Sequence, residues 1–274
     1  SAGFFEYVTG RKFWDAPRSV AFEAYRKLEV DMVLQGIYLP AEPEEWRRHT
    51  TEVLDGASKF RSADDVVAYV ESLPDPDSLE REFDFEGKLR CIQGEYLKLQ
   101  EELGNNILCL PSCKDAKFTW YMDFGYESYL TAMALYPDVM NRLFHYSAEE
   151  SRLLNMVLVE LVKQEQLPPF FFTGQDICGH QGPMVSPGLL RSIFFPAVQH
   201  ALGPLVDIDA DIIWHSDGYI LPILDDLIGC GVSGFQGFQE RSGYSVGEIA
   251  RHEVRAGRKP ILLAGLRVDT VVPF

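Results

Sequence analysis

His215 and Asp217 are the residues of this sequence whose types and spacing best suit metal binding or proton transfer. They belong to the tetrapeptide His-Ser-Asp-Gly, which directly follows the apolar run "DIIW". Side chains two residues apart in an extended segment project to the same side, so both could converge on one ligand. An imidazole beside a carboxylate can hold a metal ion or transfer a proton. The alternative is structural: Ser216 and Asp217 would cap a helix that starts near Tyr219.

Polar residues also end two other apolar runs. Asp176 ends "FFFTGQD", and Gln236, Gln239 and Glu240 end the run that begins at residue 232. The pKa of a carboxylate at the end of an apolar strand rises unless the group is paired, which makes Asp176 a candidate catalytic residue. Glutamine side chains bind amide, carboxylate or heterocycle edges without bringing charge. We therefore expect the last three residues either to contact substrate or to be ordinary loop residues.

Tyr121 lies in the aromatic segment "FTWYMDFGYES". With Phe118 and Trp120 it could line an apolar pocket for a flat ligand. The alternative is an aromatic core between a sheet and a helix, which suits Trp120 better than Tyr121.

Apolar runs and helical patterns alternate along the chain, which predicts the elements that position these residues. The runs cover 30–37, 106–111, 169–176, 211–218, 232–239 and 260–265. They are continuous rather than alternating, as in strands of a parallel sheet that are buried on both faces. Helical patterns cover 137–166, 186–201 and 219–229. Because chemistry in parallel α/β folds collects where strands end, this order supports the site suggested above.

Composition and charge limit the function classes. Lys and Arg number 25 against 41 Asp and Glu, so the formal charge of −16 argues against binding to nucleic acid or an anionic membrane. No run approaches the roughly 20 apolar residues of a membrane span, so we expect a cytoplasmic protein. The five cysteines make a disulfide framework improbable without a secretory signal. Residues 40–105 are acidic and contain helical patterns, which predicts a helical insertion.

Several of these segments, in this order, resemble the uroporphyrinogen decarboxylase superfamily, which includes corrinoid-dependent methyltransferases. The segments are "LEVDMV", "GYESYLTAMALYPDVMNRL", "GQDICGHQGPMVSPGLLRSIFFPAVQHAL", "IIWHSDGYILPILDDLIGCGVSGFQ" and "ILLAG" followed by "RVDT". The resemblance implies a (β/α)₈ TIM barrel, with its first and last strand outside this chain. It also implies a single domain over 1–274 that carries the insertion at about 40–105.

The resemblance offers two chemistries. The decarboxylases place a carboxylate near the end of the second strand, where this sequence has Gln35 and Gly36. Tyr121 does match the family's tyrosine, so Tyr121 and Gln35 are candidate substrate contacts. The methyltransferases hold zinc by His-x-Cys at the position of His215, and here Asp217 replaces the cysteine. An oxygen-rich zinc site favours demethylation over thiol methylation.

The leading expectation is a methyltransferase that works with a corrinoid protein and demethylates a small methoxy aromatic or methylamine substrate. His215 and Asp217 would bind zinc or move a proton, and Asp176 would assist them. One alternative is a decarboxylase of a porphyrinogen or a related acid, with Arg241 or Arg267 as candidates to receive substrate carboxylates and Arg191, on a helix, as the third basic residue near the site. A non-catalytic binding module is a third reading, and a homodimer is compatible with each of them.

Overall fold

The structure is a computed structural model that describes residues 2–34, 60–238 and 245–264. The chain divides into two compact units. Unit 1 comprises Ser1–Ala57 with Glu86–Ser112, and unit 2 comprises Ser58–Phe85 with Cys113–Phe274. Each unit is described by itself below.

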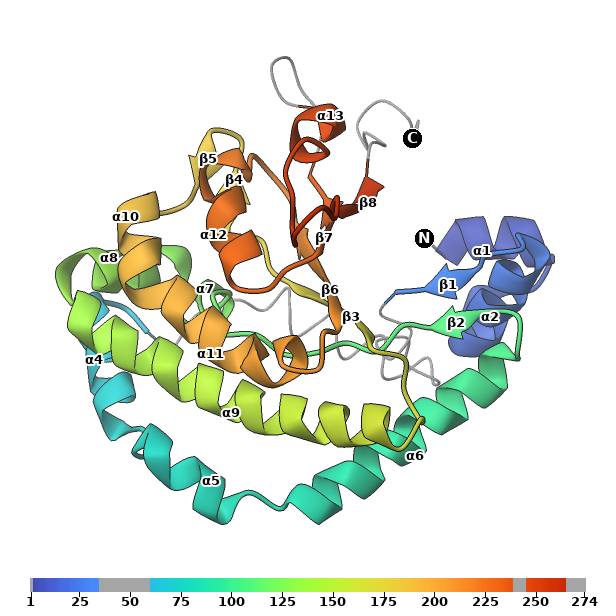
Figure 1. The fold of residues 1–274 in the computed structure, drawn as a ribbon, viewed down its shortest axis with the longest axis horizontal. Coiled ribbons are helices and arrows are strands. Elements are labelled where there is room, and N and C mark those ends of the chain that lie inside the picture. Colours follow the sequence, from blue (N-terminus) through green and yellow to red (C-terminus); the bar gives the residue numbers. More distant parts are fainter. Residues whose placement is uncertain (1, 35–59, 239–244, 265–274) are drawn as a thin grey trace. The chain divides into compact units, whose positions relative to one another are not determined.

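A four-stranded parallel sheet forms the centre of unit 2 (Figure 1). Its strands are β3 (Phe170–Gly174), β6 (Asp211–Ser216), β7 (Gly234–Gly237) and β8 (Ile261–Ala264), in the order β3-β6-β7-β8. The middle residues of β3 and β6 are buried without interruption, as expected for strands covered on both faces. The register pairs Gly174 with His215 and His215 with Gln236, so the carboxyl ends of three neighbouring strands lie level.

Helices connect and cover these strands. Those of the amino-terminal part of unit 2 are α4 (Ala63–Ser72), η3 (Pro76–Ser78), α5 (Leu79–Glu82), α7 (Tyr121–Phe124), α8 (Tyr126–Leu135) and α9 (Pro137–Lys163). Between β3 and β6 lie the antiparallel pair β4 (Cys178–Gly179) and β5 (Gly182–Pro183), then α10 (Pro187–Leu189), the π-helical turn η4 (Leu190–Phe194) and α11 (Phe195–Val206). The remaining helices are η5 (Leu221–Ile223), α12 (Leu224–Gly229) and α13 (Val246–Ile249).

The longest of these helices, α9, packs lengthwise against α11 (Figure 1). It starts at Pro137, which suits the first turn because proline lacks the N–H that would be unsatisfied there. A cluster of Phe118, Phe144 and Phe194, all fully buried, packs with ring centroids 5.2 to 6.4 Å apart. The aromatic run that follows residue 117 therefore contributes to the core, as the alternative reading of that segment held.

Unit 1 contains α1 (Ala2–Thr9), η1 (Phe13–Asp15), α2 (Pro17–Lys27), β1 (Met32–Val33), nearly all of α6 (Phe85–Leu103) and β2 (Leu108–Cys109). β1 and β2 pair in parallel. Gln100 ties the end of α6 to β2, because its amide nitrogen donates to the Ile107 carbonyl and its oxygen accepts from the Cys109 N–H. The amino-terminal core is formed by Phe13 and the buried face of α2.

All six predicted strands are present, and each pairs in parallel with a neighbour. The prediction of a mixed α/β fold with a parallel sheet is thus confirmed, while a full TIM barrel is not shown. Helices α4, η3, α5 and α6 form the part of the predicted insertion that lies within the described residues. The single-domain assignment stays a prediction.

One segment differs from the expectation about membrane spans. Within the described residues, Pro187–Val206 is a helix long and apolar enough to cross a membrane by length and composition. Half of its apolar window is buried in the protein, and α11 packs on α9, as in the core helix of many folds. The segment therefore says little about where the protein resides.

Candidate functional site

Asp176, His215 and Asp217 meet at the carboxyl ends of β3 and β6. Each offers one ligand atom, and these atoms lie within 4.8 Å of one another. In the part of the chain that the structure describes, this is the one such group of three His, Cys, Asp or Glu side chains. The side chains of Asp176 and His215 are 46% and 27% exposed, so a ligand can reach both.

His215 is held in place by Gln236, which is its partner in the β6–β7 register. Its Nδ1 lies 2.6 Å from Gln236 Oε1. An amide oxygen accepts only, so Nδ1 carries the proton and Nε2 is left to face Asp176. The next residue, Gly237, has a φ of +95°, and a Cβ there would lie 2.9 Å from His215 Nδ1. A glycine is therefore required beside the ring.

Asp176 is oriented by three contacts. Its Oδ1 lies 3.5 Å from His215 Nε2 and accepts a hydrogen bond of 2.9 Å from the Asp217 N–H. Its backbone carbonyl accepts from the Tyr121 hydroxyl at 3.0 Å. Asp217 thus contributes twice, through its backbone to Asp176 and through its carboxylate to the cluster.

Electrostatics favours the charged forms of the pair. The hydrogen bond from His215 lowers the pKa of Asp176 and, with the Asp217 N–H, outweighs the opposing effect of burial. Burial lowers the pKa of His215, but hydrogen bonds to Asp176 and Gln236 and the nearby negative charge raise it by more. The cluster can therefore move a proton between imidazole and ligand, or bind a cation through one nitrogen and two carboxylates.

The turn after His215 does not support the alternative that Ser216 and Asp217 cap a helix. Ser216 Oγ donates to the Asp217 carbonyl, and neither η5 nor α12 has a side-chain cap. The predicted helix also begins later than Tyr219, at Leu221. Gly218 explains the delay: its φ is +86°, and a Cβ there would lie 2.7 Å from the Cys178 carbonyl oxygen. The chain must turn tightly against β4 before it can form a helix.

Tyr121 is buried, and burial raises its pKa. Its ring stacks on Tyr126, with centroids 4.4 Å apart and an interplanar angle of 18°. Tyr126 is 55% exposed, so it offers an aromatic face to solvent that the sequence alone did not single out. The buried Tyr121 hydroxyl donates a hydrogen bond to the Asp176 backbone carbonyl. Its predicted contact with substrate stays a prediction.

Two polar residues next to the site escaped the sequence-based prediction. Gln175 precedes Asp176, and its side chain bonds to the segment 115–119, where Asp115 accepts a hydrogen bond from it. A polar residue directly after an apolar strand was a usable signal for Gln175. Asp115 stands in the unremarkable stretch "CKDAK", which carries no such signal.

The other predicted contacts lie elsewhere or are not described. Gln35, Gln239 and Glu240 lie outside the described residues. So do Arg241 and Arg267, two of the three basic residues expected of a decarboxylase.

The remaining basic candidate is Arg191 on the π-helical turn. It forms an ion pair with Asp226, with Nε 2.9 Å from Oδ1.

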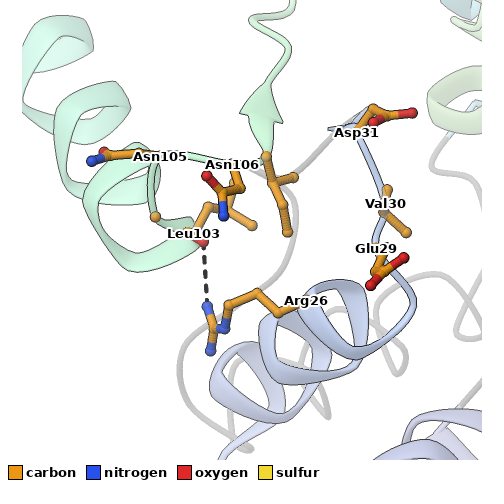
Figure 2. Close-up of a pocket in the computed structure, with 9 residues that line it drawn as sticks. Arg26, Glu29, Val30, Asp31, Leu103, Asn105 and Asn106 are labelled. Atoms are coloured by element: carbon orange, nitrogen blue, oxygen red, sulfur yellow. Dashed lines mark hydrogen bonds between the residues drawn. The ribbon is translucent and has the colours of Figure 1, made fainter.

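A pocket of about 480 Å³ lies within unit 1 and contains none of the predicted site residues (Figure 2). It lies between the end of α2 and the start of β2, and Arg26 points across it to the Leu103 carbonyl. Glu29, Asp31, Asn105 and Asn106 supply its other polar groups.

Comparison of the chain with protein-family models, with curated proteins and with solved structures found no match.

Proposed function

We propose that this chain is an enzyme of the uroporphyrinogen decarboxylase superfamily, and specifically a methyltransferase that demethylates a small methoxy aromatic or methylamine compound. A corrinoid protein would be its partner. The observation that carries this proposal is the cluster of Asp176, His215 and Asp217, whose ligand atoms lie within 4.8 Å of one another at the carboxyl ends of parallel strands. In barrel enzymes this is the end where catalytic residues gather.

The proposed fold is the (β/α)₈ barrel of that superfamily. The parallel sheet β3-β6-β7-β8 and the parallel pair β1-β2 support this proposal, because every strand of such a barrel runs parallel to its neighbours. The helices between β3, β6 and β7 are the crossovers that parallel strands require.

The donor set suits a zinc ion. Ligands at about 2.1 Å in a tetrahedral shell lie about 3.4 Å apart, and His215 Nε2 lies 3.5 Å from Asp176 Oδ1. Three protein ligands leave a fourth position open, as in catalytic zinc sites. Gln236 holds the other nitrogen of His215, which is the usual second contact of a metal-binding histidine. With two carboxylates and no thiolate, the site is harder than the cysteine-containing sites of the thiol-methylating relatives.

The chemistry divides between the partner and this chain. A reduced corrinoid on the partner would supply the nucleophile for the methyl group, and a bound zinc ion would supply Lewis acidity toward the leaving oxygen or nitrogen. Asp176, Asp217 and His215 Nε2 would hold the zinc ion, and Gln236 would keep the His215 ring turned toward it through Nδ1. Tyr121 fixes the backbone of Asp176 and so keeps this geometry from relaxing.

The test is the methyl transfer itself. The protein is incubated with a panel of methoxy aromatics and methylamines and with a reduced corrinoid, and methylcobalamin is followed by its absorption. We expect product with at least one donor and a rate at least 100-fold lower for His215→Ala. No product across the panel would contradict the proposal.

The decarboxylase alternative requires free basic residues to receive substrate carboxylates. Among the described residues, Arg191 is paired with Asp226 and is not free for this role. Binding of uroporphyrin at micromolar concentration would revive it. A non-catalytic role would instead leave cellular activity intact after His215→Ala and Asp217→Ala.

A further inference from the structure

Gln175 lies between the last residue of β3 and Asp176. Both the oxygen and the nitrogen of its side-chain amide form hydrogen bonds. Its Oε1 accepts from the Phe118 N–H at 2.6 Å and the Thr119 N–H at 3.0 Å. Its Nε2 donates to the Ala116 carbonyl at 2.7 Å and to Asp115 Oδ1. All four partners belong to the segment 115–119. One side chain therefore fastens this segment to the exit of β3.

Asp115 also accepts a hydrogen bond from a residue of β3. Its Oδ2 accepts from Thr173 Oγ1 at 2.7 Å, and its Oδ1 accepts from Gln175. Thr173 and Gln175 therefore share one carboxylate. Burial raises the pKa of Asp115 to about 6 even though these hydrogen bonds oppose the shift. A buried carboxylate remains charged only where hydrogen-bond donors replace the water that it has lost.

The backbone turns sharply between β3 and Asp176. β3 ends at Gly174, whose φ of +123° turns the chain away from the strand direction. A Cβ on Gly174 would lie 2.2 Å from the backbone N and O of His215, so the two strands approach closely here. Beyond this point Asp176 is fixed by the Tyr121 hydroxyl and the Asp217 N–H. Tyr121 begins α7 two residues after the segment 115–119 that Gln175 fastens.

We propose that Gln175, paired with Asp115, is a positioning residue that holds Asp176 toward His215 and thereby sets the affinity of the cluster for a divalent metal ion. This inference rests on the proposed metal-binding function of the site. The pair acts through the backbone of Asp176 and the placement of Tyr121 and touches no ligand atom itself.

The experiment is a double-mutant cycle with Zn²⁺ as the probe. Gln175→Glu keeps the length of the side chain and its acceptor for the Phe118 N–H, but it turns a carboxylate oxygen toward Asp115. Asp115→Asn alone can still accept from Gln175 through its amide oxygen and donate to the Thr173 hydroxyl, so it is the mild half of the cycle. In the double variant the Asn amide can donate to the new carboxylate, which restores the contact between residues 175 and 115, while the hydrogen bond to the Ala116 carbonyl stays lost.

We expect Gln175→Glu to bind Zn²⁺ at least tenfold more weakly, Asp115→Asn to lose less than about threefold, and the double variant to bind at least threefold more tightly than Gln175→Glu, since paired residues are not additive. Affinity is measured by competition with a chelator at a temperature where circular dichroism shows every variant folded. Gln199→Glu, the same change at an exposed position on α11, is the matched control and should leave affinity unchanged. Thr173→Val is a milder variant that removes one hydrogen bond to Asp115, with an expected loss of about threefold.

The outcomes separate this inference from the proposed site. Wild-type protein that does not bind Zn²⁺ overturns both. Zn²⁺ binding by the wild type with equal affinity in Gln175→Glu overturns the positioning role and leaves the metal site standing, even where the melting temperature falls. Weak binding in Gln175→Glu without recovery in the double variant overturns the pairing with Asp115. Recovery in the double variant supports the inference, because a general loss of stability would not be reversed by a second substitution.

Discussion

Glu149 links α9 and α11, the two helices of unit 2 that pack most extensively against each other. Its contacts give the size of its contribution to the free energy of unfolding. Both carboxylate oxygens accept from Arg152, at 2.7 and 2.8 Å, and Oε2 also accepts from His200 Nε2 at 2.7 Å. Arg152 lies on α9 with Glu149, whereas His200 lies on α11. The Glu149 side chain is only 9% exposed, so solvent screens these contacts weakly.

The change is Glu149→Gln, which keeps the shape and removes the charge. The hydrogen bond from Arg152 lowers the pKa of Glu149 from 4.5 to about 2, against the opposing effect of burial and with help from His200. A shift of about 2.5 units at about 1.4 kcal/mol per unit amounts to roughly 3 kcal/mol of folding free energy. Because the folded pKa is depressed, this contribution is complete above pH 4.5 and is lost as the pH falls toward 2.

We therefore expect the variant to lose about 3 kcal/mol of unfolding free energy at pH 7 and about half of that at pH 3. Urea unfolding followed by circular dichroism at both pH values measures the difference. The control is Glu160→Gln on the same helix, whose partner is the neutral Gln164 and which should cost less than about 0.5 kcal/mol. The reasoning is refuted if Glu149→Gln costs the same at pH 7 and pH 3, because the loss would then come from packing.

Two further substitutions test how the site is supported. Gln236→Leu removes the acceptor of His215 Nδ1 while keeping the volume, and we expect zinc affinity to fall roughly 10- to 100-fold in a chelator competition; unchanged affinity would show that Gln236 does not orient the ring. Gly174→Ala would place a methyl group 2.2 Å from the His215 backbone, so we expect a clear drop in melting temperature. Gly188→Ala is its control, since nothing lies within 4 Å of a Cβ there, and equal melting temperatures for the two variants would contradict the argument.

The strands could be predicted because strands buried on both faces are continuous apolar runs. The run at 169–176 became β3 (Phe170–Gly174) and the run at 211–218 became β6 (Asp211–Ser216). The start of α9 at Pro137 and the cap of α10 by Ser186, which accepts from the Leu189 N–H at 3.2 Å, also follow from local rules. The start of the helical segment after β6, at Leu221, did not, because it depends on the close approach of Gly218 to β4.

The site was predicted in part for the same reason. Polar residues after apolar runs identified Asp176, His215 and Asp217 one by one. That Asp176 and His215 lie side by side depends on the pairing of β3 with β6, which no local pattern encodes. The contact between Gln175 and Asp115 joins residues 60 positions apart, and its geometry emerges only when the segment after Cys113 folds against β3.

The central claim is that Asp176, His215 and Asp217 form a metal site, and X-ray absorption of the zinc-loaded protein tests it most directly. The account predicts one zinc ion per chain, bound by nitrogen and oxygen at about 2.0 to 2.2 Å with one imidazole in the shell. It also predicts that His215→Ala abolishes the signal of the bound imidazole. Sulfur at about 2.3 Å, or zinc that remains bound with an unchanged shell in His215→Ala, would contradict it.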